Sequence, residues 1–161
     1  MHICVVGTGY VGLDTGACLA DFGNSVTCVD NDETKIAKLL DGVMPIYEPG
    51  LDVVVGRARG RNLHFSTEVD SAIAAADMVF LSVNTPIKTK GVGAGQASDL
   101  RCIEASACQV AAAAMGHTIV VEKSTLPVRT AEAVKAILAS AQGDAGGTKT
   151  FAVLSNPEFL A

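Results

Sequence analysis

The stretch from Ile3 to Asp30 constrains the fold of this chain more than any other part of the sequence. An apolar run leads into a turn that contains three glycines, a helical pattern follows as far as Phe22, and a second apolar run stops at Asp30. A strand, a glycine-rich turn, a helix and a second strand in this order predict a βαβ unit. The chain is therefore expected to begin with two parallel strands joined through a helix.

The turn has the spacing G-x-G-x-x-G, with Gly7, Gly9 and Gly12 at its fixed positions. Gly7 permits the tight turn, Gly9 lets the backbone approach a pyrophosphate, and Gly12 lets the helix pack closely on the strand. The phosphates would then meet the unpaired N–H groups at the positive end of the helix dipole. Such a spacing also occurs in ordinary loops, but with the flanking strands and helix it predicts a dinucleotide site.

Asp30 indicates which dinucleotide binds. It ends the second strand, where a carboxylate can accept hydrogen bonds from the hydroxyls of the adenosine ribose. The same carboxylate would repel the 2′-phosphate of NADP. Lys35 could attract that phosphate, but Asp32 and Glu33 add negative charge beside Asp30. The sequence therefore predicts NAD as the cofactor.

The composition indicates one domain and no nucleic-acid partner. A chain of 161 residues, 49% of them hydrophobic, is large enough for one domain with a real core. The net charge is −5 and no long basic run occurs, which argues against binding to nucleic acid. The densest basic cluster, Arg57, Arg59 and Arg61, is interpreted as a solvated helix end.

The sequence also predicts a cytoplasmic protein without a membrane partner. Strand residues begin at Ile3, which leaves no room for a signal peptide, and no apolar run approaches the length of a membrane span. The five cysteines are odd in number and lack C-x-x-C spacing, as is typical of a reducing compartment. Cys4, Cys18 and Cys28 are expected to be small buried hydrophobes, and no metal site is predicted.

Apolar periodicity and capping residues predict the remaining elements. Strands are expected at 63–65, 78–83, 117–122 and 151–154, and helices at 32–40, 68–73, 98–114 and 128–141, while residues 51–55 are expected to begin another short helix. Asn31 and Thr67 are expected to cap two of these helices, and Leu40 to lie on an apolar face. Six strands alternating with helices predict an α/β fold of the Rossmann type, a doubly wound parallel sheet with the order 3-2-1-4-5-6.

Three loops are expected to meet at the carboxyl edge of this sheet, because loops that follow parallel strands open onto one crevice. They are Asn84-Thr85-Pro86, Lys123-Ser124-Thr125 and Asn156-Pro157-Glu158. The hydroxyls of Thr85 and Thr125 could orient a water or a carboxamide, and Glu158 could act as a general base. Two alternatives stay open: Ser124 and Thr125 could cap a helix, and Glu158 could lie exposed in a turn. The glycine-rich loop 87–97 is expected to be mobile and functional.

Five motifs resemble, in order and spacing, the amino-terminal domain of the UDP-glucose 6-dehydrogenases, a branch of the nucleotide-sugar dehydrogenase family. These motifs are Gly7–Gly12, Tyr47–Leu51, Val83–Pro86, Val121–Thr125 and Leu154–Ala161. Two stretches, Lys123–Val128 and Ser155–Pro157, are more similar to this branch than to the GDP-mannose branch. The loop Lys88–Gly95 is similar to it too, particularly to its eukaryotic-type members.

The resemblance implies the oxidation of UDP-glucose to UDP-glucuronate, a polysaccharide precursor, with two NAD reduced and a thioester formed on a catalytic cysteine. By matched position, NAD would contact Gly7, Thr8, Gly9, Tyr10, Val11, Gly12, Asp30, Lys35, Val83, Asn84, Thr85, Pro86 and Ser124. The substrate side would comprise Lys123, Arg129, Glu158, Phe159 and Leu160. Thr125 and Glu158 would be catalytic, because they would hold or activate the water that hydrolyses the thioester.

The resemblance also implies that residues 1–161 form an NAD-binding domain, with the central helix, the sugar-nucleotide domain and the catalytic cysteine outside this chain. The expected partners are a UDP-sugar and either the carboxyl-terminal half of the enzyme or a second copy. The isolated chain is expected to bind NAD without turnover. Two alternatives stay open: a non-catalytic module that senses or sequesters NAD, and a relative that acts on GDP-mannose or an N-acetylated UDP-sugar.

Overall fold

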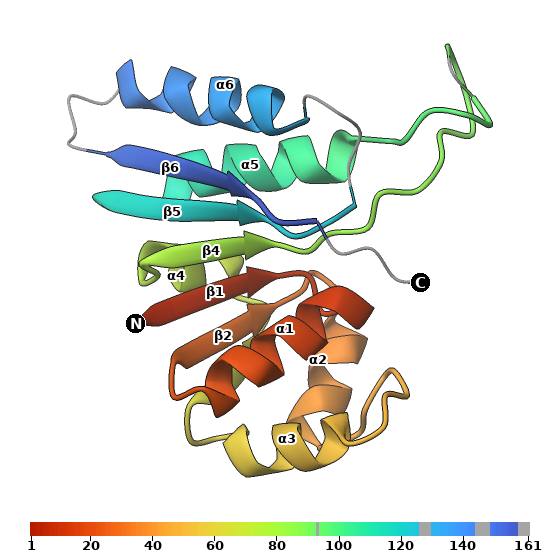
Figure 1. Ribbon diagram of the computed structural model, residues 1–161, viewed down its shortest axis with the longest axis vertical. Coiled ribbons are helices and arrows are strands. Elements are labelled where there is room, and N and C mark those ends of the chain that lie inside the picture. Colours follow the sequence, from red (N-terminus) through yellow and green to blue (C-terminus); the bar gives the residue numbers. More distant parts are fainter. Residues whose placement is uncertain (93, 126–129, 144–148, 158–161) are drawn as a thin grey trace.

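Parallel strands form one sheet in the computed structural model, which describes residues 1–92, 94–125, 130–143 and 149–157. The strands are β1 (His2–Val6), β2 (Ser25–Val29), β3 (Leu63–Ser66), β4 (Met78–Leu81), β5 (His117–Glu122) and β6 (Thr150–Ser155). Their order is β3-β2-β1-β4-β5-β6, and every neighbouring pair is parallel (Figure 1). The predicted doubly wound sheet is therefore confirmed, including its strand order.

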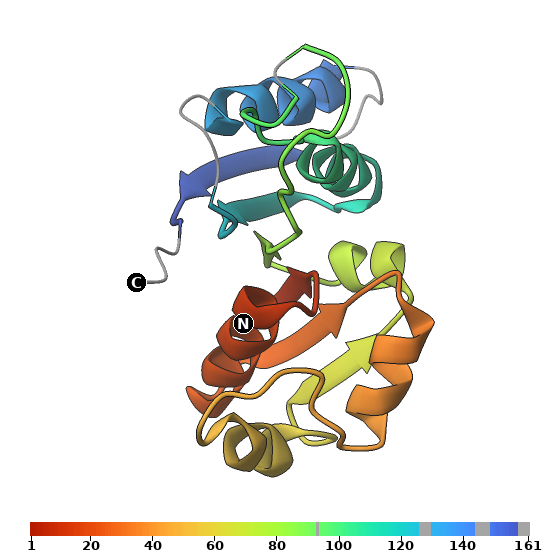
Figure 2. The same ribbon diagram turned by 90° about the vertical axis from the view of Figure 1, so that its right-hand side faces the viewer.

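Helices pack against both faces of this sheet. They are α1 (Tyr10–Asp21), α2 (Glu33–Leu40), α3 (Leu51–Ala58), α4 (Val69–Ala74), α5 (Arg101–Ala113) and α6 (Thr130–Gly143). One core cluster contains residues of α1, α2 and α3, and a second contains residues of α4, α5 and α6. Figure 2 shows α1 and α5 on opposite sides of the sheet. A parallel sheet covered in this way requires strands that are apolar on both faces.

Strand β1 shows this two-sided burial. Ile3 and Val5 belong to the cluster that contains α1, whereas Cys4 and Val6 belong to the cluster that contains α5. All four are buried, because successive side chains of a strand point to opposite faces. Burial raises the pKa of the Cys4 thiol to about 12 and also raises that of Cys28. Both cysteines therefore act as the small core residues predicted from the sequence.

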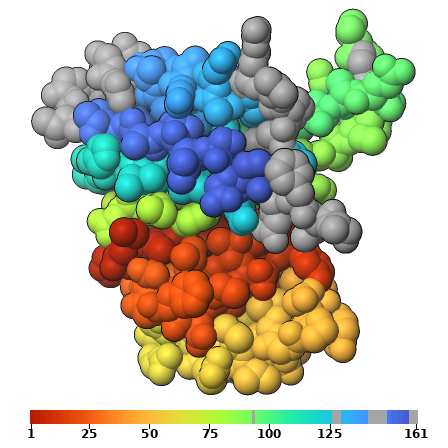
Figure 3. Space-filling view, viewed as in Figure 1, coloured from red at the N-terminus to blue at the C-terminus, as the bar shows by residue number. Residues whose placement is uncertain are grey.

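The two ends of the loop between β4 and α5 are hydrogen-bonded to each other and form a neck. Ile87 and Ser98 form an antiparallel bridge, and the N–H of Lys88 donates to the carbonyl of Ala97 at 2.7 Å. Beyond this neck the segment stands away from the body of the molecule (Figures 1 and 3). The predicted long loop is present, and its mobility stays a prediction.

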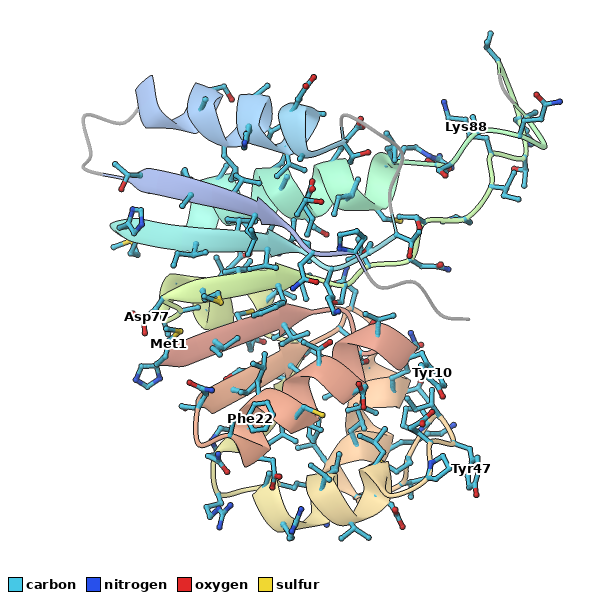
Figure 4. All side chains as sticks on the ribbon, in the orientation of Figure 1. Met1, Tyr10, Phe22, Tyr47, Asp77 and Lys88 are labelled. Atoms are coloured by element: carbon cyan, nitrogen blue, oxygen red, sulfur yellow. The ribbon has the colours of Figure 1, made fainter. Side chains whose placement is uncertain are left out.

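The carboxyl ends of neighbouring strands are aligned. Leu81 at the end of β4 pairs with Val6 of β1 on one side and with Glu122 of β5 on the other. Figure 4 shows Tyr10 at this carboxyl edge of the sheet and Asp77 at the opposite edge. The loops after these strands therefore begin at the same level.

The prediction that Asn31 and Thr67 cap helices is wrong. Asp32 is the N-cap of α2, where its carboxylate accepts hydrogen bonds from two backbone N–H groups of the first turn, at 3.0 and 3.2 Å. The residue before α4 is Glu68, and its side chain makes no capping bond. In both cases the predicted cap lies one residue too early, because residue type does not fix where the helical dihedral angles begin.

Leu40 and Cys18 are exposed, although both were expected to be buried. Leu40 is the last residue of α2 and is 56% exposed, while its neighbour Leu39 is buried. Cys18 lies on the outer side of α1, with its thiol 4.0 Å from a carboxylate oxygen of Asp14. A helix rotates by about 100° per residue, so a residue beside the apolar stripe leaves the core.

Glu122 places a carboxyl group inside the core at the end of β5. It is 2% exposed, and its Oε1 has no hydrogen-bond partner among the residues that the structure describes. Burial raises the pKa of Glu122, while the Ser155 hydroxyl and the charge of Lys135 oppose this rise. Because the folded chain keeps this proton to higher pH than the unfolded chain, its stability falls as pH rises through the interval between the two pKa values.

We predict that Glu122→Gln stabilises the chain at pH 7 by about 1 kcal/mol and leaves it nearly unchanged at pH 4, where the native carboxyl is protonated. Urea unfolding across this pH range measures the difference. Glu104→Gln, at an exposed position of α5, is the matched control and should show no such trend. If Glu122→Gln raises the free energy of unfolding equally at pH 7 and pH 4, the carboxyl group of Glu122 does not titrate in a buried position.

Candidate functional site

A pocket of about 670 Å³ lies at the carboxyl ends of β1, β2, β4 and β5. Its lining is Val6, Gly7, Gly9, Tyr10, Val11, Val29, Asp30, Asn31, Lys35, Val69, Ser82, Val83, Asn84, Thr85, Cys102, Ala105, Ser106, Gln109, Ser124 and Thr125. The strands β1 and β4 are neighbours at its centre, yet the chain leaves them for helices on opposite faces. Ligands of doubly wound sheets bind at such a switch point.

The glycines of the first turn serve different purposes. Gly7 has a φ of +102°, and a Cβ atom there would lie 2.5 Å from the carbonyl oxygen of Ser82. A Cβ at Gly12 would lie 2.0 Å from the carbonyl oxygen of Gly7. A Cβ at Gly9 would meet no described atom within 4 Å. The fold thus requires Gly7 and Gly12, whereas Gly9 leaves space that opens onto the pocket.

The amino end of α1 faces this space without a side-chain cap. Its N-cap residue is Gly9, and no acidic residue occupies the first turn. The N–H groups of such a turn have no partner within the helix, and the helix dipole adds partial positive charge. By contrast, α2 is capped by Asp32. The uncapped end of α1 is suited to a phosphate-type anion.

Asp30 lies on the other side of the pocket, directly after β2. Its Oδ2 accepts hydrogen bonds from the N–H and the hydroxyl of Thr8 at 2.9 and 2.7 Å, and its Oδ1 accepts one from the N–H of Asp32 at 3.0 Å. The Nζ of Lys35 lies 3.5 Å from Oδ2. Burial alone would raise the pKa of Asp30, but these hydrogen bonds and the nearby ammonium hold it below its ordinary value. The site therefore presents a fixed carboxylate rather than a neutral acid.

The exit loops of β4 and β5 meet at the carboxyl edge of the sheet, as predicted, and hydrogen bonds join them. The hydroxyl of Ser124 donates to the carbonyl of Val83 at 2.7 Å, and the hydroxyl of Thr85 donates to the carbonyl of Thr125 at 3.2 Å. Behind them, the N–H of Asn156 donates to the carbonyl of Glu122 at 2.9 Å. The Ser124 hydroxyl thus joins two loops.

The pocket gathers most of the predicted site residues. Gly7, Gly9, Tyr10, Val11, Asp30, Lys35, Val83, Asn84, Thr85, Ser124 and Thr125 line it. Thr8, Gly12, Pro86 and Lys123 do not line it. Four predicted residues, Arg129, Glu158, Phe159 and Leu160, lie outside the described part of the chain. The predicted substrate side therefore stays a prediction.

One wall of the pocket was missed from the sequence. It comes from α5, where Cys102, Ala105, Ser106 and Gln109 line the pocket. Their spacing of three, four and seven residues places them on one helix face. Small and polar residues at this spacing in the sequence could have indicated that this face of α5 lines a site. Gln109 is held by its Nε2, which donates to a carboxylate oxygen of Asp70 at 2.7 Å.

Within the described ranges, no group of three histidine, cysteine or acidic side chains is placed to hold a metal ion. No described helix is both long enough and apolar enough to cross a membrane.

The family model for the NAD binding domain of the UDP-glucose/GDP-mannose dehydrogenase family matches residues 1–161. UDP-glucose 6-dehydrogenase 1 of Glycine max is 50% identical over 163 residues, which cover 100% of this chain and 33% of that protein. The UDP-glucose 6-dehydrogenase of Caenorhabditis elegans is 50% identical over 161 residues, which cover 99% of this chain and 33% of that protein. This chain thus spans about a third of the length of these relatives.

Solved structures agree with the sequence relatives. GDP-mannose dehydrogenase from Pseudomonas aeruginosa has a TM-score of 0.86 at 32% identity, over 100% of this chain and 37% of that one. A UDP-glucose dehydrogenase from Pyrobaculum islandicum has a TM-score of 0.86 at 36% identity, over 99% of this chain and 36% of that one. The family model, the sequence relatives and the matching fold show that the chain belongs to the UDP-glucose/GDP-mannose dehydrogenase family and corresponds to its NAD-binding domain.

Proposed function

We propose that the pocket binds NAD with its pyrophosphate at the amino end of α1 and its adenosine ribose at Asp30. The observation that carries this proposal is that the open space at Gly9 and the fixed carboxylate of Asp30 belong to one pocket. An anion site and an acceptor for ribose hydroxyls are the two features that a dinucleotide requires from this fold. When bound, NAD supplies the acceptor for a hydride.

The residues of this chain would position the cofactor. The first turn of α1, which begins after Gly9, offers backbone N–H groups, and Val83, Asn84 and Thr85 continue the pocket beyond β4. Because Ser124 fixes the carbonyl of Val83, the loop after β5 keeps the loop after β4 in place. A cofactor held between rigid loops loses little further freedom before reaction.

The environment of Asp30 favours NAD over NADP. A 2′-phosphate would lie beside a carboxylate whose lowered pKa keeps it ionised at neutral pH. Lys35 already lies 3.5 Å from that carboxylate and is 43% exposed, so solvent and Asp30 both weaken its attraction for a phosphate.

We further propose that residues 1–161 form one NAD-binding domain of a protein that oxidises UDP-glucose to UDP-glucuronate in the cytoplasm. The 50% identity to UDP-glucose 6-dehydrogenases supports this substrate, and five thiols outside disulfides fit a reducing compartment. In this proposal the central helix, the sugar-nucleotide domain and the cysteine that forms the thioester belong to the remaining two thirds of such a protein. Thr125, at the pocket, and Glu158 would hold the hydrolytic water. Lys123, Arg129, Phe159 and Leu160 would lie on the substrate side.

We predict that the chain binds NAD at least about tenfold more tightly than NADP, because only NADP sets a phosphate against Asp30. Asp30→Asn should narrow this ratio by removing the repulsion. Calorimetric titration of both cofactors measures it, and Asp52→Asn on α3 is a control for the change in net charge. Equal affinity for both cofactors in the unchanged chain would show that Lys35 outweighs Asp30.

We also predict that the isolated 161-residue chain binds NAD but does not oxidise UDP-glucose. Burial raises the pKa of the core thiols of Cys4 and Cys28, which do not line the pocket, so neither supplies a reactive thiolate. Cys102 does line the pocket, but in the proposal the cysteine that forms the thioester belongs to the remaining two thirds of the protein. The absorbance of NADH with saturating UDP-glucose and NAD is the measurement. Sustained turnover that Thr125→Val abolishes would contradict the assignment of the covalent step to another part of the protein.

A further inference from the structure

Thr8 has an unusual position for a residue of the glycine-rich turn. It lies between Gly7 and Gly9, yet it is 1% exposed and does not line the pocket. Its side chain therefore does not reach a bound cofactor. Its hydroxyl instead donates to Oδ2 of Asp30 at 2.7 Å, and its N–H donates to the same oxygen at 2.9 Å. These bonds link the turn after β1 to the end of β2.

The hydrogen bonds that Asp30 already accepts determine how many acceptor positions of its carboxylate are left for a ligand. A carboxylate accepts about four hydrogen bonds, two on each oxygen. Thr8 fills both positions on Oδ2, and the N–H of Asp32 fills one on Oδ1 at 3.0 Å. The side chain of Asp30 is 15% exposed and lines the pocket. One acceptor position on Oδ1 is therefore left for a ribose hydroxyl.

We propose that Thr8 is a positioning residue for cofactor recognition: its hydroxyl fixes the Asp30 carboxylate so that Oδ1 is presented to the adenosine ribose. This inference rests on the proposed binding of NAD. The same hydrogen bond holds the ribose acceptor against the turn that faces the pyrophosphate. Thr8 thus couples the two halves of the site without touching the ligand.

The other contacts of Asp30 do not replace this one. The ammonium of Lys35 is farther away, at 3.5 Å, and its side chain is 43% exposed, so water competes with it. The N–H groups of Thr8 and Asp32 belong to the backbone and remain in Thr8→Val and Thr8→Ser. Removing the Thr8 hydroxyl therefore changes a single hydrogen bond to a charged group.

The test compares Thr8→Val, which has the same shape without the hydroxyl, with Thr8→Ser, which keeps it. Titration calorimetry with NAD and NADP should show about tenfold weaker NAD binding and a smaller NAD-to-NADP ratio for Thr8→Val. Thr8→Ser should stay within about twofold of the unchanged chain. Thr118→Val is the control, since Thr118 is fully buried in β5, outside the pocket, and its hydroxyl has no partner in the described part of the chain.

A second readout uses the chain without cofactor. The carboxyl ¹³C shift of Asp30, followed against pH, should show a higher pKa in Thr8→Val than in the unchanged chain or in Thr8→Ser, because one bond to the ionised form is lost. A merely structural role of Thr8 would move neither this pKa nor the NAD-to-NADP ratio.

Unchanged NAD affinity in Thr8→Val would overturn the proposal, and so would an unchanged pKa of Asp30. Tighter NAD binding would also overturn it, because the hydroxyl would then compete with the ribose for Oδ2. Failure of the unchanged chain to bind NAD would instead contradict the proposed function, while the pKa of Asp30 would still decide whether Thr8 controls this carboxylate.

Discussion

The close contact between the first turn and its neighbours determines the structure of this site. At Gly7 the backbone of the turn lies so close to the backbone of Ser82, directly after β4, that no Cβ atom fits, and at Gly12 it lies as close to the carbonyl of Gly7. One helical turn later, a Cβ at Gly16 would lie 2.4 Å from the sulfur of Cys28 in β2. Because glycines on the inner face of α1 let this helix approach the sheet closely, its uncapped amino end lies beside the carboxyl edge of β1 and β4. The pocket, its anion-binding end and the position of Asp30 all follow from this packing.

The sequence predicted the sheet because its signals are local and redundant. Strands such as β1 are apolar at consecutive positions, as required of strands covered on both faces, and only one common strand order places a G-x-G-x-x-G turn at the centre. The meeting of the loops at Thr85 and Ser124 followed from this topology, since aligned parallel strands open onto one edge. These predictions required no knowledge of individual side-chain contacts.

The details that the sequence did not predict depend on side-chain direction and on partners distant in the chain. Asn31 and Asp32 are both good capping residues, and only the backbone dihedral angles identify Asp32 as the cap. The α5 wall was missed because Cys102 and Gln109 reach the pocket across the sheet from the glycine turn. The hydrogen bond from Thr8 to Asp30 joins residues 22 positions apart, and no local sequence pattern predicts it. Each of these features requires the tertiary structure.

Gly9→Val decides whether the space beside the glycine-rich turn holds the pyrophosphate of a dinucleotide. Gly9 has a φ of −73° and an extended ψ, which valine adopts readily, and no described atom lies within 4 Å of the added Cβ. We expect a free energy of unfolding within about 0.5 kcal/mol of the unchanged chain and a loss of NAD affinity of about a hundredfold or more by titration calorimetry. A stable Gly9→Val chain that still binds NAD with unchanged affinity would contradict it.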